Sequence, residues 1–472
     1  MGKIKDAILL LLVLLSLGQT YCLWFGFPPL EKTEEIPSRL LQLAGEMPPV
    51  HYFLLPSSLV LYDSAGEPFY LERCTRQACN FWQEINPVLL EILRRESSPL
   101  AVSRKEVPAE PRNTITLEFS PPYPLEIELN SDHRLYFSAA QKIQIDQDSN
   151  SVYLFTSEDE IYYISYPAWV GEQLSEIIRP CYEENIAVAA TYLQGPLMPL
   201  SDFKIDQVDE EEAQSEPGEE EEPFLVAEGN ILVPQQALCL PDLIIGREEV
   251  NKEELLESIF WDESLARRIE ERDGAVFFTD GEKSIRFYEQ GGFEFVAPLL
   301  EKNSANISPA SAILKGAEYI SFYGGLPDNT FLEQLELTEE GYRLTWQVYY
   351  SGLPLKSKQP ALEVLVNEGG LSRYKRNLFL PVSEISSSQQ LVNYGEALHR
   401  ALQIFLEQHR SAVNLSAGKL VLNNIYLGYY LKNQDFEGEI QVPPAWVVEI
   451  GDNFKVYLHA RTLDLLGTEI SS

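Results

Sequence analysis

Carboxylate-rich loops and clusters of histidine are the usual sources of metal and catalytic sites, and one stretch of this chain resembles such a loop. The segment DQDSNS, which begins at Asp146, opens like a calcium-binding loop. That loop needs glycine at its sixth position and glutamate at its twelfth, where this chain has Ser151 and Ser157. The residues are typical of a turn instead, and we expect no bound metal here.

The five histidines also lack the spacing of a catalytic or metal site. His399 and His409 fall on one expected helix, but ten residues at about 100° each place them roughly 280° apart. The other three, His51, His133 and His459, are isolated. The chain lacks the zinc-protease, nucleophile-elbow, P-loop and dinucleotide motifs. We therefore expect no enzyme, no catalytic residues and no cofactor; a hydrolase whose catalytic set comes from distant segments is the alternative.

The cysteines leave two interpretations open. Outside the cytoplasm, Cys74, Cys79, Cys181 and Cys239 could form disulfides, and Cys74 and Cys79 are the nearest pair in sequence. Alternatively, all four are unbridged, partly buried thiols, because a domain of this size does not require a disulfide for stability. The sequence does not decide between the two.

Charge excludes some classes of partner. The chain has 36 Lys and Arg against 72 Asp and Glu, a formal net charge of −36. Phosphate recognition needs basic patches, so we expect no nucleic-acid partner. The same charge disfavours binding flat on an anionic membrane surface. With 45% hydrophobic residues, the chain is globular rather than disordered.

An apolar run near the N-terminus predicts a membrane anchor. Residues 7–27 would form a helix about 31 Å long, which matches an apolar bilayer core of about 30 Å. Lys3 and Lys5 precede it, so residues 1–6 are expected in the cytoplasm and the bulk of the chain outside. A cleaved signal peptide is the alternative, but residues 18–25 lack a small-x-small cleavage site. We expect a single-pass cell-membrane protein.

The order of polar and apolar segments predicts several α+β domains after this helix, built from antiparallel sheets packed with helices. We expect a stalk at residues 28–49, an N-terminal ectodomain at 50–205, a central domain at 230–382 and a C-terminal domain at 383–472. Between the first two domains, residues 206–229 form an acidic linker or insertion. Nine of the fourteen residues from Asp209 to Glu222 are acidic, a pattern that disfavours folding.

Local patterns place individual elements within these domains. Residues 87–95 are predicted to form a short helix with Pro87 in its first turn. Residues 151–165 are predicted to form two strands around an acidic turn. Asn251 is suited to cap a helix, and Gly291-Gly292 to turn a hairpin. Apolar residues recur at helical spacing in 387–409 and at every second position in two later strands. The central and C-terminal domains thus share a helix-then-strands plan.

Several segments, in this order and spacing, resemble the YycH family of membrane-anchored bacterial regulators. They are the anchor ending in LWF, residues 251–298, YYSGLPL (349–355), LSRYKRNLFL (371–380), IYLGYY (425–430) and VPPAWVVEI (442–450). The last two belong to a domain similar to that of the YycI family. This resemblance implies a non-enzymatic protein that binds and modulates a WalK-type sensor histidine kinase, together with a YycI-type protein, in the two-component system governing cell-wall metabolism. It does not fix whether the kinase is restrained or promoted.

Helices in lipid associate through packing and hydrogen bonds, so the anchor itself is a candidate contact. One stripe of the expected helix, which we predict to face the partner helix, comprises Leu9, Val13, Ser16, Gln19 and Thr20. Alternatively, the polar groups of this stripe satisfy themselves near the outer interface. The competing function is an envelope protein that binds a wall polymer or peptide, without a kinase partner.

Overall fold

The computed structural model describes most of the chain from residue 48 onward. The described ranges are 48–71, 74–95, 100–108, 111–125, 139–156, 160–183, 188–199, 224–234, 238–260, 266–289, 291–297, 307–408, 419–432, 438–451 and 454–470. The predicted transmembrane helix at 7–27 lies outside these ranges, as does most of the predicted acidic linker. Among the helices within them, none has both the length and the apolar composition needed to cross a bilayer.

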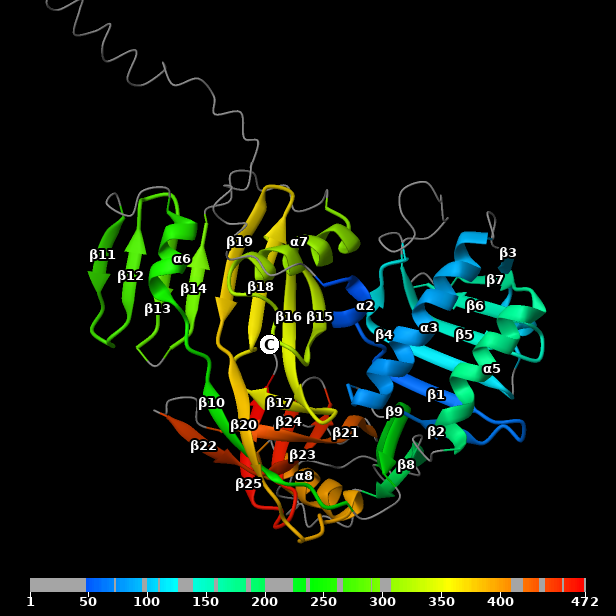
Figure 1. Ribbon diagram of the computed structural model, residues 1–472. Helices are drawn as coiled ribbons and strands as arrows, with labels where there is room; N and C mark the ends of the chain where they lie inside the picture. The colour runs from blue at the N-terminus through cyan, green and yellow to red at the C-terminus, as the bar shows by residue number, and fades with distance from the viewer. Residues whose placement is uncertain are drawn as a thin grey trace, which may run out of the picture. The chain divides into compact units, whose positions relative to one another are not determined.

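The N-terminal region is an antiparallel sheet with two long helices (Figure 1). Its strands lie in the order β2–β1–β4–β5–β6–β7–β3, and α3 packs against α5. The short helix α2 (Val50–Phe53) precedes the sheet. The element bounds are β1 Ser58–Tyr62, β2 Pro68–Tyr70, α3 Arg76–Arg95, β3 Leu100–Val102, β4 Thr114–Tyr123, β5 Ala140–Asp146, β6 Ser151–Phe155, β7 Ile161–Ser165 and α5 Ala168–Glu183.

One prediction for this region is wrong. Helix α3 begins at Arg76, so Pro87 lies inside the helix and not in its first turn. Proline removes one helical hydrogen bond and crowds the preceding turn. Upstream of it, however, Phe81, Trp82 and Ile85 are buried on the same helix. Burial of three large apolar side chains outweighs the local preference, because each contributes about 1.5–3 kcal/mol.

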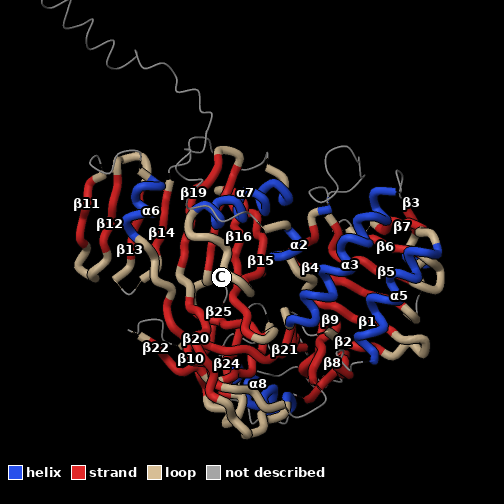
Figure 2. The backbone as a smooth tube through the Cα atoms, in the orientation of Figure 1, coloured by secondary structure: helices blue, strands red, loops and turns tan. Residues whose placement is uncertain are grey.

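The central region contains an eight-stranded antiparallel sheet in the order β11–β12–β13–β14–β19–β18–β16–β15. Helices α6 and α7 accompany it (Figure 2). The bounds are α6 Lys252–Ile259, β11 Arg267–Glu270, β12 Val276–Thr279, β13 Ser284–Phe287, β14 Phe293–Val296, α7 Pro309–Phe322, β15 Thr330–Thr338, β16 Gly341–Tyr350, β18 Leu362–Asn367 and β19 Gly370–Arg376.

Helices α6 and α7 cover the same face of this sheet. On α6, Lys252 lies over the ring of Phe287 in β13, while on α7 Gly316 packs closely on Trp346 in β16. Cross-strand partners share a face of a sheet. Phe287 and Trp346 are connected by successive partners across the sheet, through Phe293, Arg376 and Leu362. The opposite face carries neither helix.

The C-terminal region is a second sheet, in the order β8–β9–β21–β23–β24–β25. Helix α8 packs on β23 and β24, and Phe405 of α8 meets Phe454 of β24 edge to face. Strand β17 also pairs with the end of β21, in parallel. The bounds are β8 Val188–Pro199, β9 Phe224–Pro234, β17 Leu353–Ser357, α8 Tyr394–Gln408, β21 Lys419–Leu431, β23 Pro444–Ile450, β24 Phe454–His459 and β25 Leu465–Ile470.

One structural unit therefore occurs three times after residue 251. Each unit is a helix followed by four antiparallel strands that pair in chain order, and we call it the helix-meander unit. The α6 unit has β11 to β14, the α7 unit has β15, β16, β18 and β19, and the α8 unit has β21, β23, β24 and β25. The fourth strands of the α6 and α7 units, β14 and β19, pair antiparallel and join the two units into one sheet.

A strand between these units binds the α7 and α8 units through one buried arginine each. Strand β10 (Asp242–Arg247) lies between β20 (Phe379–Ile385) and β22 (Glu439–Val442). After its end, Glu248 accepts two hydrogen bonds from Arg376 of β19, at 2.6 and 2.7 Å. At its start, Asp242 accepts one from Arg461, at 2.5 Å. We call the Arg376–Glu248 and Arg461–Asp242 pairs the central latch and the C-terminal latch.

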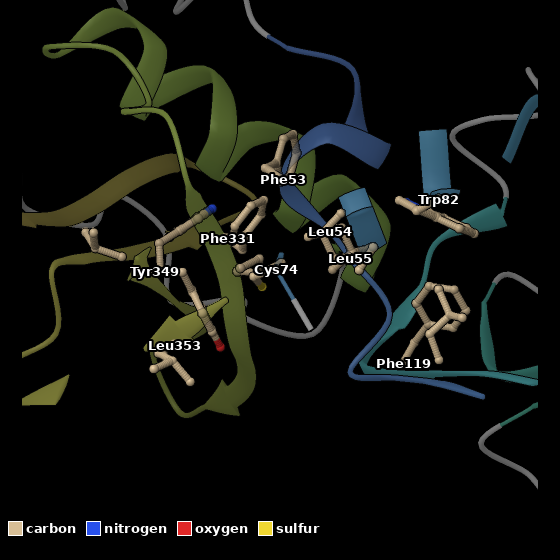
Figure 3. Close-up of a cluster of buried hydrophobic side chains, with 14 of the residues drawn as sticks. Phe53, Leu54, Leu55, Cys74, Trp82, Phe119, Phe331, Tyr349 and Leu353 are labelled. Carbon is tan, nitrogen blue, oxygen red and sulfur yellow. The ribbon is translucent and has the colours of Figure 1, made fainter. Parts of the chain in front are cut away.

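An apolar core connects the N-terminal and central regions. Figure 3 shows Phe53 and Leu54, at the end of α2, beside Phe331 of β15. Phe331 in turn packs edge to face on Tyr349 of β16, with ring centroids 5.7 Å apart. All four side chains are buried. The two regions therefore share apolar surface along β15, and the edge of the central sheet is covered there.

The expected α+β class with antiparallel sheets is confirmed, as are several local predictions. Strands β6 and β7 occupy the two runs predicted in 151–165, and β13 and β14 form the hairpin predicted around Gly291-Gly292. Asn251 caps α6 by accepting the backbone N–H of Glu254. Cys79 and Cys239 are unbridged thiols, which is the second of the two interpretations that the sequence left open for them. Burial raises the pKa of the Cys79 thiol to about 11.

Candidate interaction surface

The helix-free face of the central sheet carries a row of alternating charges across four neighbouring strands. In-register partners place Glu363 of β18 beside Lys375 of β19, Lys375 beside Glu294 of β14, and Glu294 beside Arg286 of β13. We call these four residues the central ladder. The row continues to Phe277 of β12. In a chain of net charge −36, this is a row in which positive and negative side chains balance.

The central ladder is held by ion pairs of moderate length. Lys375 Nζ lies 3.7 Å from Glu363 Oε1 and 3.9 Å from Glu294 Oε1. Arg373, also on β19, places Nε 3.6 Å from the same Glu294 oxygen. All these side chains keep part of their surface in solvent, so each pair contributes about 0–1 kcal/mol. The ladder therefore stabilises the fold weakly and leaves its charges available to a partner.

Arg286 and Tyr288 order one end of the row. Arg286 binds Glu271 at 2.7 Å and Asp273 at 2.6 Å, and its guanidinium lies over the Tyr288 ring, 5.2 Å from the centroid. The Tyr288 hydroxyl donates to Glu294 at 2.9 Å. Partial burial and then the Glu294 carboxylate raise the pKa of Tyr288 to about 12. The phenol is therefore a neutral donor near pH 7 and fixes the Glu294 carboxylate in place.

The same row ends in apolar side chains at the edge of the sheet. Phe277 of β12 and Ile269 of β11 are cross-strand partners. Phe277 is half-buried and Ile269 is 37% exposed. A balanced charge row that leads to exposed apolar groups combines the polar and apolar elements of protein interfaces. This face can accept another protein surface, and its charges would set the orientation.

A second charge row lies on the helix-free face of the α8 unit. Here Glu449, Lys455 and Glu469 are partners on β23, β24 and β25, and we call them the C-terminal ladder. Lys455 Nζ lies 2.9 Å from Glu449. Tyr457 donates to Glu469 at 2.7 Å and stacks on Tyr430 with centroids 3.9 Å apart. Burial, followed by the charge of Glu469, raises the pKa of Tyr457.

The residues that the sequence singled out are not gathered at either row. The predicted anchor stripe of Leu9, Val13, Ser16, Gln19 and Thr20 lies outside the described residues. Asp146, the start of the calcium-like segment, accepts backbone N–H bonds from Asp148 and Ser149, as expected for a turn. In the part of the chain that the structure describes, no three His, Cys, Asp or Glu side chains are grouped at metal-binding distance.

Neither ladder is predicted from the sequence, although period-two spacing offers a signal. Arg373 and Lys375 are two apart within one strand, and side chains at that spacing point to the same face. What the spacing cannot supply is the neighbour. Glu294 and Lys375 belong to two segments that carry the family resemblance, 251–298 and 371–380, and the pairing of β14 with β19 brings them together.

Comparisons with known proteins add little to this geometry. No family model matches the chain, and no curated protein matches it. A solved structure, the crystal structure of an uncharacterized protein from Eubacterium rectale ATCC 33656, is similar to it with 12% sequence identity and a TM-score of 0.35. That match covers 52% of this chain and 91% of the other. We base no argument on it.

Proposed function

We propose that this chain is a membrane-anchored, non-enzymatic regulator whose outer portion binds a sensor histidine kinase of the WalK type, together with a YycI-type protein. The resemblance of its segments to the YycH family supports this role. The observation that carries the binding proposal is the central ladder, a balanced and solvent-accessible charge row that ends in exposed apolar groups. Its partner would present the complementary order of charges.

Regulation by such a protein requires different affinities for two kinase states. A binding protein shifts a two-state equilibrium only by the difference in its binding free energy for the two conformations. In our proposal the anchor stripe, residues 9–20, contacts a partner helix in lipid, and the central ladder contacts the partner's outer domain. When one contact has formed, it raises the effective concentration of the partner at the other contact. Loss of either contact therefore weakens the complex.

Charge reversal in the central ladder tests the outer contact. In the full-length chain, Lys375→Glu would create a run of like charges with Glu363 and Glu294, and we expect at least about a tenfold rise in the Kd for the kinase, or about 1.4 kcal/mol. Lys315→Glu is the matched control, because Lys315 lies on α7, over the face that carries the helices, and is partly exposed. Equal binding by the two variants would reject the ladder as the contact.

Exchange of the N-terminal segment tests the anchor. Replacing residues 7–27 by an unrelated span should reduce recovery of the kinase and alter its phosphorylation, while the Lys315→Glu control keeps both. Saturable binding of a wall polymer that survives both the exchange and Lys375→Glu would favour the alternative function. Turnover of a substrate that one side-chain change abolishes would favour a hydrolase.

A further inference from the structure

The internal pairing of helix-meander units indicates how such units associate. Strands β14 and β19 are the fourth strands of two units and pair antiparallel over four residues on each strand. The join keeps α6 and α7 on one face and continues the buried layer beneath them, with Phe293 opposite Arg376 and Phe295 opposite Tyr374. The fourth-strand edge of a unit is therefore a surface that accepts another fourth strand.

In the described residues, one fourth strand has no such neighbour. Strand β7, the last of the N-terminal meander, pairs with β3, and β14 and β19 pair with each other. Strand β25 pairs with β24 alone. Its other edge presents backbone N–H and C=O groups that can hydrogen-bond to a further strand.

Sequence at this edge also differs from that of β11, another edge strand among the described residues. Natural proteins protect free edges with charged side chains, particularly lysine, or with proline. Strand β11 follows that rule, with the sequence RRIE. Strand β25 has the sequence LLGTEI, without lysine, arginine or proline. Its end residues Leu465 and Ile470 are 39% and 69% exposed.

From these observations we propose that β25 is a self-association edge at which two copies of this chain pair their β25 strands antiparallel about a two-fold axis. The occupant is a second copy because the pairing needs another fourth strand, as in the β14–β19 join, and among the described helix-meander units β25 is the fourth strand without one. A two-fold antiparallel pair is self-complementary and closes as a dimer. Both α8 helices then lie on one face of the continuous sheet.

Side-chain direction selects the register. Thr468 and Ile470 are partners of Val456 and Phe454, so they lie on the face covered by α8, whereas Gly467 and Glu469 lie on the opposite face. In a register centred on Thr468, Gly467 of one copy lies opposite Glu469 of the other. Residues of the α8-covered face then meet residues of the same face in the second copy. This register also avoids placing the two Glu469 carboxylates directly opposite each other, which would be repulsive.

Net charge gives the dimer a salt dependence that distinguishes it from the charge-mediated contact with a partner. Each copy carries a formal charge of −36, so repulsion between the copies opposes pairing. Added salt screens that repulsion beyond a Debye length of about 10 Å at 0.1 M. Dimerisation through β25 should therefore strengthen as salt rises, whereas binding through the central ladder should weaken.

A cysteine at the two-fold centre tests the register. In the full-length chain with Cys22 and Cys239 replaced by serine, Thr468→Cys brings two thiols together at the axis. Under oxidation we expect a disulfide-linked dimer that reductant reverses. The control Ile269→Cys, on the charged β11 edge, should stay monomeric on a non-reducing gel. Cross-linking of both variants alike, or of Ile269→Cys alone, would overturn the proposal.

A lysine at the same position tests the edge itself. Thr468→Lys places a charged side chain on the edge strand, which opposes pairing with another strand. It also lowers the net negative charge of each copy, so a loss of dimer cannot come from general repulsion. We expect a Kd for dimerisation at least about tenfold higher by light scattering, with an unchanged far-UV circular dichroism spectrum. Ile269→Lys should leave the dimer intact. A monomeric mass for the unchanged chain at all salt concentrations, or a dimer indifferent to Thr468→Lys, would contradict β25 pairing.

Discussion

The α7 unit and the α8 unit have the same plan, but their charge rows lie in different surroundings. In the α7 unit Lys375 is 36% exposed, and its nearest carboxylate oxygen lies 3.7 Å away on Glu363, which is 16% exposed. In the α8 unit Lys455 lies 2.9 Å from Glu449, beside Tyr457 and Tyr430, which are 1% and 3% exposed. The C-terminal row is therefore paired more closely and lies against buried aromatic rings, whereas the lysine of the central row keeps more of its surface in solvent.

The two latches differ in the opposite sense to the rows. In the central latch, Arg376 is 2% exposed and all its donors are used, by Glu248, Tyr374 and the carbonyls of Gly324 and Gly325. In the C-terminal latch, Arg461 donates to Asp242 and to one backbone carbonyl. Its buried Nε has no hydrogen-bond partner. The central latch is thus the more fully satisfied of the two.

The largest expected effect follows from removing the central latch. Arg376→Ala would leave the Glu248 carboxylate and two carbonyl groups without their donor, and we expect the free energy of unfolding to fall by about 3–5 kcal/mol. Arg461→Ala should cost less, about 1–3 kcal/mol, since it removes fewer bonds. Urea unfolding followed by tryptophan fluorescence measures both. A larger cost for Arg461→Ala would show that bond satisfaction does not rank the latches.

The same substitution in the two rows provides the next test. Tyr457→Phe removes the hydroxyl that donates to the partly buried Glu469, and hydrogen bonds to charged groups contribute about 1.5–3 kcal/mol. Tyr288→Phe removes the matching donor to Glu294, which retains Lys375 and solvent, so we expect less than about 1 kcal/mol. Melting temperatures of the two variants report the difference. Equal losses would contradict the contrast in burial.

Alkaline pH should weaken the folded state through its tyrosines. The pKa of Tyr288 and that of Tyr430 are each raised to about 12, against about 10 in an unfolded chain. Above pH 10 the unfolded state releases these protons first, so the stabilisation is complete below about pH 10 and is lost towards pH 12. Urea midpoints across this range, with phenolate absorbance, should show the fall. Tyr288→Phe should make it shallower.

The smallest effect is expected at the lysines of the two rows. Lys375→Ala removes pairs of 3.7 and 3.9 Å that are open to solvent, and should change the free energy of unfolding by about 0–1 kcal/mol. Lys455→Ala removes the shorter pair with Glu449, at 2.9 Å, so its cost should be greater. Salt would reduce the first effect more than the second. If Lys375→Ala lowered the free energy of unfolding more than Lys455→Ala did, the contrast between the two rows would be contradicted.

Local sequence patterns were sufficient for much of the secondary structure. Alternation predicted the buried faces of β23 and β24, where Trp446, Val448 and Val456 are buried, and Asn251 correctly marked the start of α6. These signals act within a few residues, so they can be read along the chain. The start of α3 was missed, because burial against the rest of the molecule extends that helix past its proline.

The candidate surface could not be obtained in the same way. The spacing of Arg373 and Lys375 indicates that they share a face, but it does not indicate which strands lie beside them. Their neighbours Glu294 and Glu363 come from β14 and β18, one distant in sequence and the other close. Strand pairing over long separations depends on the total burial that a sheet achieves and not on any one segment.

By itself, the sequence determined the α+β class, the acidic character of the chain and the repeated helix-then-strands plan, since periodicity, composition and capping are local properties. Tertiary structure decided which fourth strands meet, which arginines are buried against β10, and how closely the charges of each row pair. Those outcomes depend on surfaces that exist only after distant segments pack, and burial then changes the energy of the same side-chain pair several-fold.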